Sequence, residues 1–105
     1  MVSAAPGDLG KPRPAVVVQS DLFNPTHASI VICPITWHPV DAPLFRLTIP
    51  PSRTNGLKAE SQIMVDKIMA VHRDRIGKRI GRLSDAEMEQ VDRALGLWLG
   101  IAAPA

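Results

Sequence analysis

Two prolines that flank a single arginine constrain the start of this chain more than any other feature. The run reads GKPRPAVVVQ over residues 10–19. Each proline fixes its own φ and biases the preceding residue toward extended geometry, so stiff backbone aims Arg13 before any tertiary contact forms. A guanidinium held in this way suits phosphate, because its planar fork of donors matches the phosphate oxygens. The alternative is a charged residue that closes a loop before a strand, and both interpretations stay open at this point.

Length and composition describe one small domain over residues 1–105 with a single modest core. Apolar residues make up 46% of the chain, which argues against disorder. No apolar stretch approaches the ~20 residues of a membrane span, and no secretory signal is visible at the start. We therefore expect a cytoplasmic protein without membrane association. Cys33 has no second cysteine for a disulfide or zinc site, and we expect a small buried side chain.

Short apolar runs between turn residues predict a mainly β protein. Proline and glycine punctuate the chain, and Asn55-Gly56 is a strong turn signal. The expected strands cover residues 2–5, 15–20, 28–35, 44–49, 62–71 and 76–83. Together with one terminal helix, they indicate a small, strongly twisted antiparallel sheet or SH3-like barrel of the α+β type.

The C-terminal helix has the clearest local signature. Ser84-Asp85-Ala86-Glu87 forms a capping box, in which the Ser84 and Glu87 side chains satisfy free amides of the first turn. Met88, Val91, Leu95 and Trp98 then recur at helical spacing, and we expect this stripe to pack on the core. Gly100 is a plausible stop.

Positive charge is concentrated in residues 67–82, which hold six Lys or Arg against one Asp, with His72 as well. A basic stripe of this kind is typical of a surface that meets a polyanion or an acidic partner. An ordinary solvated strand-and-turn surface is the alternative on charge alone. Tyrosine is absent and only four aromatic residues are present, which disfavours a broad base-stacking platform.

Several kinds of catalytic site lack their usual residues here. The histidines are scattered without metal-ligand spacing, no glycine-rich loop runs from a strand into a helix, and no Gly-x-Ser-x-Gly elbow occurs. Cys33 lacks an obvious base partner, while Asp66 and Asp74 lie among cations and are expected in structural ion pairs. We expect no metal and no cofactor. Arg13 and Thr36 remain, each at the end of a predicted strand, although a lone hydroxyl there more often caps its own backbone.

Four segments together resemble the MazF/PemK toxin family, and they follow in the same order. They are GKPRPAVVVQSD at residues 10–21, CPIT at 33–36, VDKI at 65–68 and RIGKRIGRLS at 75–84. The resemblance extends from about residue 6 to residue 98. It implies a compact barrel-like sheet with a C-terminal helix, a homodimer, and an acidic antitoxin as partner.

The resemblance also implies a metal-independent, sequence-specific endoribonuclease that cleaves single-stranded RNA. The ribose 2′-hydroxyl would attack the adjacent phosphate, leaving a 2′,3′-cyclic phosphate and a 5′-hydroxyl. The family's catalytic arginine and threonine fall on Arg13 and Thr36. An arginine stays protonated at neutral pH, so the general base is left unassigned.

Substrate contacts are implied for the loops at residues 6–11 and 37–43 and for residues along the basic surface. Trp37 would stack on a splayed base or, alternatively, cover the core, while His38 would touch phosphate. The substrate-binding residues expected on this basis are Lys11, Ser20, Trp37, His38 and Lys67.

The chain departs from the family pattern in two places. It begins Met1-Val2-Ser3 where family members usually carry an Arg-Gly-Asp-Ile-like leader, which implies a shortened first strand. Lys67 stands where the family often has Gln. Two other functions stay open: a toxin of related fold that binds DNA gyrase without cutting RNA, and a small nucleic-acid-binding module.

Overall fold

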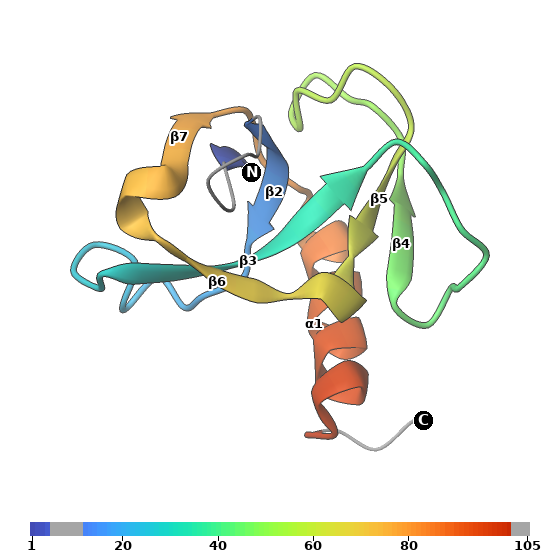
Figure 1. Cartoon of the computed structure of the whole chain (residues 1–105). Coiled ribbons are helices and arrows are strands. Elements are labelled where there is room, and N and C mark those ends of the chain that lie inside the picture. The colour runs from blue at the N-terminus through green and yellow to red at the C-terminus, as the bar shows by residue number, and fades with distance from the viewer. Residues whose placement is uncertain (5–11, 102–105) are drawn as a thin grey trace.

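The computed structural model describes residues 1–4 and 12–101, which form a twisted antiparallel sheet with one long helix beneath it (Figure 1). The expected mainly β architecture is confirmed. The strands are β1 (Val2–Ala4), β2 (Arg13–Val17), β3 (Ser29–Thr36), β4 (Arg46–Ile49), β5 (Ser61–Met64), β6 (Met69–His72) and β7 (Ile76–Arg79). Two short 3₁₀ helices, η1 (Val65–Lys67) and η2 (Arg73–Arg75), flank β6, and α1 (Asp85–Leu99) closes the chain.

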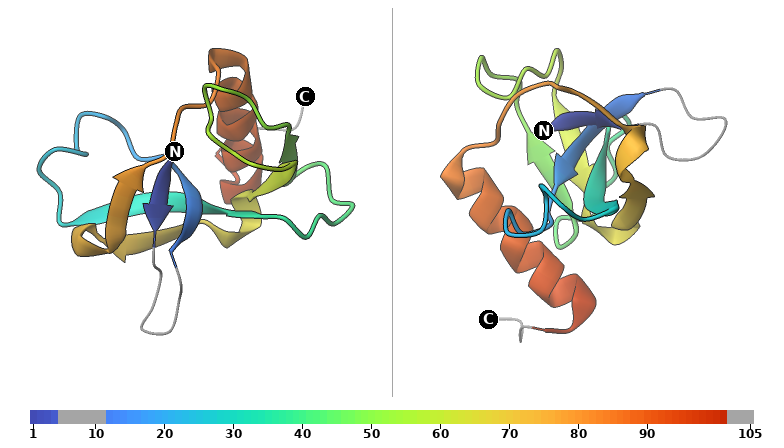
Figure 2. Two further views of the ribbon diagram at one scale, coloured as in Figure 1. Left: turned by 90° about the horizontal axis from the view of Figure 1, so that it is seen from above. Right: turned by 90° about the vertical axis from the view of Figure 1, so that its left-hand side faces the viewer.

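Strand β3 organises the sheet, whose order is β4-β5-β3-β2-β1-β7 with β6 paired separately to β3. One edge of β3 pairs with β2, while the other edge is shared between β6 at its beginning and β5 at its end. Figure 2 shows the result: the sheet curls so that β1, β2, β6 and β7 form one half and β4 and β5 the other.

The single strand expected over residues 62–71 is wrong, and the register explains why. Ile35 lies opposite Ile63, and Ile32 lies opposite Met69. Between these two pairs, β3 advances by three residues (35 − 32), whereas the facing segment advances by six (69 − 63). The three surplus residues form η1, which buries Val65 fully and separates β5 from β6.

Two groups of buried side chains make up the interior, one on each face of β3. Val16, Cys33, Ile35 and Ile63 belong to the larger group, against which α1 packs. The smaller group lies within the half made by β1, β2, β3 and β6 and is formed by Ala4, Ala15, Ile30, Ile32 and Val71. Because side chains alternate along a strand, β3 supplies both groups.

Helix α1 follows its sequence signature. Ser84 Oγ accepts a hydrogen bond from Glu87 N at 3.1 Å, and Glu87 Oε1 accepts one from Ser84 N at 2.9 Å, so the capping box is present. Gly100 ends the helix in the left-handed conformation, with φ of +72°. The core role of the apolar stripe is confirmed at Val91, whereas Trp98 is 47% exposed and packs on the Phe45 ring at 5.2 Å between centroids.

Several strand ends differ from the sequence expectation because local hydrogen bonds end or extend them. β2 begins early, at Arg13, which pairs with Ala4 of β1. It stops at Val17, and the chain soon turns at Ser20, whose carbonyl accepts from Phe23 N. β4 begins only at Arg46, since residues 42–46 form a turn, and β7 ends at Arg79 rather than at residue 83.

The strand expected at residues 2–5 is present as β1, except for residue 5, which lies outside the described residues. β1 is short, yet it pairs with both β2 and β7. The strand expected at residues 28–35 is present one position later as β3, and the turn at Asn55-Gly56 is confirmed, with Gly56 at φ of +69°. Within the described ranges, no helix is long and apolar enough to cross a membrane.

Candidate active site

The pairing of β2 with β3 brings Arg13 and Thr36 to the same end of the sheet. Ala15 lies opposite Pro34 and Val16 opposite Cys33. The same register continued by two residues sets Arg13 opposite Thr36. Facing residues of antiparallel strands project to the same side of the sheet, with Cβ atoms about 4.5–5.5 Å apart. Two strand ends that are 23 residues apart in the chain (36 − 13) thus carry neighbouring polar side chains.

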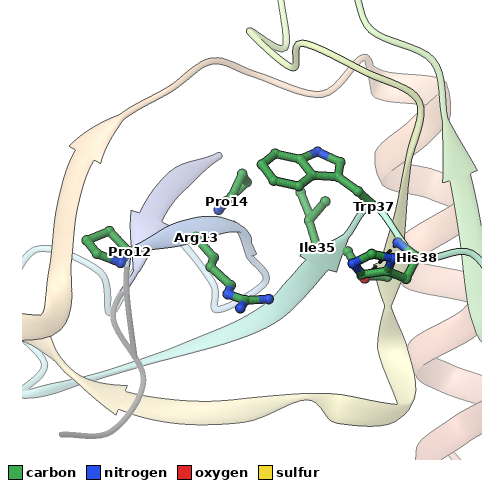
Figure 3. Close-up of a pocket in the computed structure, with 7 residues that line it drawn as sticks. Pro12, Arg13, Pro14, Ile35, Trp37 and His38 are labelled. Atoms are coloured by element: carbon green, nitrogen blue, oxygen red, sulfur yellow. Dashed lines mark hydrogen bonds between the residues drawn. The ribbon is translucent and has the colours of Figure 1, made fainter. Parts of the chain in front are cut away.

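A pocket of about 370 Å³ surrounds this pair and is lined by Pro12, Arg13, Pro14, Ile35, Thr36, Trp37 and His38. Figure 3 shows that Pro14, Ile35 and Trp37 stand together on one side of the strand ends. The Arg13 side chain extends away from them, toward the side on which His38 lies. The pocket therefore combines an apolar wall with a polar wall.

Thr36 is oriented by the turn that follows it. Its Oγ1 accepts a hydrogen bond from the backbone N of His38 at 3.0 Å. The capping role expected for a lone hydroxyl at a strand end is thus present. This bond occupies an acceptor site of the hydroxyl and leaves its proton to donate elsewhere, because a hydroxyl has one donor and two acceptor sites.

Arg13 is exposed, and no group in the described ranges forms a hydrogen bond or ion pair with its guanidinium. Its backbone is nevertheless fixed, since Pro12 and Pro14 flank it and it pairs with Ala4. A stiff main chain therefore presents a cation that is available to an anionic ligand. The unpartnered guanidinium fits the phosphate interpretation of the Pro-Arg-Pro run.

Trp37 and His38 line the pocket on different sides. Trp37 stands beside Pro14 and Ile35 and is 58% exposed, so a face of its ring is open to a planar group. His38 is exposed on the polar side of the pocket. Of the seven site residues expected from the sequence, these two join Arg13 and Thr36 in one cavity.

The other three expected residues are placed differently. Lys11 and the loop at residues 6–11 lie outside the described residues. Ser20 is exposed in the turn after β2, where its Oγ accepts from Leu22 N at 3.2 Å, and Lys67 is exposed on η1. Neither Ser20 nor Lys67 lines the pocket of Arg13.

The basic stripe of residues 67–82 runs over η1, β6, η2 and β7. Part of its charge has a structural use. Arg73 donates to the carbonyls of His27 and Asn24 and thereby fastens the loop after β2, and Arg82 lies 3.6 Å from Asp85. Some cations of the stripe therefore make structural contacts within the fold, and others form a charged surface.

Asp66 and Asp74 lie in ion pairs, as expected from the cations around them. Arg46 donates to both carboxylate oxygens of Asp66, at 2.6 and 3.0 Å, and this bidentate contact lowers the pKa of Asp66 below the ordinary carboxyl value. Asp74 lies 3.4 Å from His72 Nδ1 at an exposed position.

Cys33 is fully buried, as expected, and burial followed by the charge of Asp66 raises the pKa of its thiol to about 11. Since the thiolate is the nucleophilic form, the thiol is chemically quiet at neutral pH. No cluster of three or more His, Cys, Asp or Glu side chains able to hold a metal occurs in the part of the chain that the structure describes.

Sequence reasoning missed one residue beside this site. Gln62 of β5 lies opposite Thr36 and is only 6% exposed, and it bonds to the backbone of Val40 in the loop that follows Trp37 and His38. The signal that could have found it is a glutamine at the first position of the strand expected over residues 62–71, directly before the apolar residues Ile63, Met64 and Val65, because an amide buried beside apolar residues is hydrogen-bonded.

The fold and the pocket define a small, twisted β protein in which two neighbouring strand ends present an oriented hydroxyl and an arginine that has no partner among the residues the structure describes. The model of the PemK-like, MazF-like toxins of type II toxin–antitoxin systems matches residues 2–99, so the chain belongs to this family.

Relatives agree with the assignment. A probable endoribonuclease MazF of Mycolicibacterium smegmatis is 44% identical over 93 residues, which cover 89% of this chain and 84% of the relative. Endoribonuclease MazF9 of Mycobacterium tuberculosis is 32% identical over 94 residues, with 85% and 79% covered. A mycobacterial endoribonuclease solved in complex with its cognate antitoxin superposes with a TM-score of 0.80 at 25% identity, covering 98% of this chain and 94% of that one.

Proposed function

We propose that this protein is the toxin of a type II toxin–antitoxin pair and acts as a metal-independent, sequence-specific endoribonuclease on single-stranded RNA. The observation that carries the proposal is the opposition of Arg13 and Thr36 in one open pocket, with no partner for the guanidinium among the described residues. Of the two relatives described above, one is named a probable endoribonuclease and the other an endoribonuclease. The comparisons give no support to the gyrase-binding alternative.

The pocket suits an internal phosphoryl transfer. The ribose 2′-hydroxyl attacks the adjacent phosphorus while the bond to the 5′ oxygen of the next nucleotide breaks. The products are a 2′,3′-cyclic phosphate and a 5′-hydroxyl, the second formed when the departing oxygen takes up a proton. Because the nucleophile belongs to the substrate, the protein has to position it in line and stabilise charge on the non-bridging oxygens.

Each side chain of the pair has a distinct task in this reaction. Arg13 binds the scissile phosphate through bidentate hydrogen bonds from its guanidinium and neutralises the negative charge that develops on the phosphate in the transition state. Thr36 Oγ1 is held by the His38 amide and donates its proton to a phosphate oxygen or orients the 2′-hydroxyl. Trp37 stacks on a base next to the cleaved bond, and His38 contacts a phosphate from the polar wall.

Contacts farther from the cleaved bond and the cellular partners extend the proposal. Ser20 and Lys67 bind RNA outside the central pocket, and Lys11 is a further RNA contact. The active form is a homodimer in the cytoplasm, and an acidic antitoxin neutralises it. The mycobacterial neighbour solved with its cognate antitoxin supports the expectation of such a partner.

Incubation of the purified protein with single-stranded RNA in excess EDTA tests the proposal. We expect cleavage at a short, recurrent sequence and fragments that end in 2′,3′-cyclic phosphate and 5′-hydroxyl groups. Arg13→Ala and Thr36→Ala should each lower the rate by about 10²–10³-fold, the typical effect of losing one oriented donor. Cleavage that stops in EDTA and returns with a metal would overturn metal independence.

Two matched variants control for charge and for hydroxyl loss. Arg93→Ala removes an exposed arginine from α1, and Thr26→Ala removes an exposed threonine from the loop after β2. Both should cut RNA at the wild-type rate, and all four variants should give the circular dichroism spectrum of the wild type. Undiminished cleavage by Arg13→Ala and Thr36→Ala would remove these residues from the mechanism.

A further inference from the structure

The residues that face one another across four strands form a polar row. Thr36 of β3 lies opposite Gln62 of β5, and Gln62 lies opposite Thr48 of β4. On the other side of β3, the register places Arg13 of β2 opposite Thr36. Facing side chains share one side of the sheet, so the catalytic pair proposed above continues directly into two further polar side chains.

Gln62 uses its whole amide within the protein. Its Oε1 accepts from Val40 N at 2.9 Å, and its Nε2 donates to Val40 O at 3.0 Å and to Thr48 Oγ1 at 3.4 Å. The two bonds to Val40 imitate the pairing of one backbone residue with another. Because the main-chain donor and acceptor of Val40 are fixed groups, they also determine which end of the amide is oxygen.

The tie to Val40 has consequences for the pocket. The chain between Thr36 and Val40 carries two residues that line the pocket, Trp37 and His38. At its start, His38 N is bonded to Thr36 Oγ1, and at its end, Val40 is held by Gln62. Since Gln62 is itself 6% exposed and pairs with Thr36, both ends of this segment are anchored to the same strand pair.

We infer that Gln62 is a positioning residue, which holds residues 37–40 so that Trp37 and His38 face the RNA bound at Arg13 and Thr36. The inference rests on the endoribonuclease function proposed above. Gln62 does not touch the reacting atoms in this proposal, because both of its amide protons are donated within the protein, to Val40 O and Thr48 Oγ1, and its oxygen is directed at Val40 N. Its loss should therefore weaken RNA binding and relax the choice of base beside the cleaved bond more than it slows the chemical step.

Two substitutions and one control test this role. Gln62→Leu keeps a similar volume but removes both bonds to Val40, whereas Gln62→Glu keeps the acceptor and loses the donor. Gln90→Leu makes the same change at an exposed position of α1. Hydrogen exchange of the Val40 amide measures the tie directly. Initial cleavage rates over a range of RNA concentrations separate KM from kcat, and end sequencing of the fragments reports base choice.

We expect Gln62→Leu to raise KM by about tenfold, the effect of losing one or two hydrogen bonds, while kcat changes by less than about threefold. Val40 exchange should quicken by a similar factor, and cleavage should spread to additional sequences. Gln62→Glu should shift the same quantities in the same direction by at least as large a factor, because its carboxylate would be buried against Val40 O. If Gln62→Leu does not fold, Gln62→Met, an uncharged side chain of similar length that also lacks both bonds to Val40, serves in its place. Gln90→Leu should match the wild type.

The outcomes separate this inference from the proposed function. Unchanged KM and base choice in a folded, active Gln62 variant would overturn the positioning role alone. A fall in kcat at constant KM would also overturn it, because a purely structural residue would act by lowering the active fraction. A wild-type protein that neither binds nor cuts RNA would overturn the proposed function, and the positioning role with it.

Discussion

Arg13 and Arg46 lie at the starts of two strands of the same sheet, with β5 and β3 between them, and their surroundings are opposite. Arg13 opens β2 between two prolines, is exposed, and has no partner among the described residues. Arg46 opens β4 and makes a bidentate contact with Asp66, in which the side chains are only 12% and 17% exposed. The guanidinium of Arg13 is thus available to a ligand, whereas that of Arg46 forms a structural salt bridge.

What decides between the two uses is the supply of an acidic partner. The η1 turn, made of the three residues by which the β5–β6 segment exceeds β3, carries Asp66 to Arg46. Among the described residues that line the pocket around Arg13, none carries a carboxylate. A cation without a counter-ion can bind an anionic ligand at little desolvation cost, whereas a paired and partly buried cation contributes to stability instead.

The largest effect is expected on stability, when the Arg46–Asp66 contact is removed. Arg46→Ala leaves the Asp66 carboxylate partly buried without its partner, and we expect a loss of about 3 kcal/mol in the free energy of unfolding. Urea unfolding followed by circular dichroism measures it. Arg93→Ala, at an exposed position, should change stability by less than about 0.5 kcal/mol. Equal free energies of unfolding for the two variants would show that the Arg46–Asp66 contact does not stabilise the fold.

A charge-preserving change tests the other arginine. Arg13→Lys keeps the positive charge but loses the two-pronged donor, so we expect the RNA cleavage rate to fall by about 10²-fold while the urea midpoint stays at the wild-type value. Initial rates on a short fluorescent RNA report the first quantity. A lysine variant with full activity would show that Arg13 contributes only its positive charge and not its bidentate hydrogen bonds.

The pH dependence of stability sharpens the comparison further. Arg46 lowers the pKa of Asp66, so the pair contributes its full stabilisation above the ordinary carboxyl pKa of about 4 and loses it as the pH falls through the lowered value. We expect the stability gap between wild type and Asp66→Asn to be constant from pH 5 to pH 8 and to shrink below about pH 4. A gap that widens in acid would reverse the assigned direction.

Salt should have the smallest effect and should separate the two arginines. If Arg13 neutralises one phosphate of a single strand, an increase from 50 to 200 mM KCl should raise KM by about threefold more in the wild type than in Arg13→Ala, because both proteins keep all other phosphate contacts. The Arg46–Asp66 contact is shielded from solvent, so the melting temperature should hardly move over the same range. A steep loss of stability with an unchanged KM would contradict both assignments.

Much of the fold, and the candidate residues Arg13 and Thr36, could be predicted because each depends on a pattern of adjacent residues. The capping box, the Asn55-Gly56 turn and the short apolar runs each depend on a few adjacent residues. Arg13 and Thr36 stood out because prolines and a strand end marked them before the fold was known. Resemblance to a family supplied the reason to pair them, which spacing alone could not.

The remainder depends on contacts between distant segments. The break at η1 follows from how β5 and β6 share an edge of β3, and nothing within residues 62–71 specifies that sharing. The role of Gln62 depends on where the chain passes 22 residues earlier, at Val40. Neither periodicity nor propensity carries such information, because both describe only neighbours in the chain.

The η1 turn uncouples the two strands that share one edge of β3. β5 and β6 each keep their own register, and three residues between them take up the difference. An insertion or deletion in such a turn changes a loop rather than shifting every side chain of a strand to the opposite face. The end of β3 that carries Thr36, beside β5, can therefore vary in evolution while the interior built on β6 stays as it is.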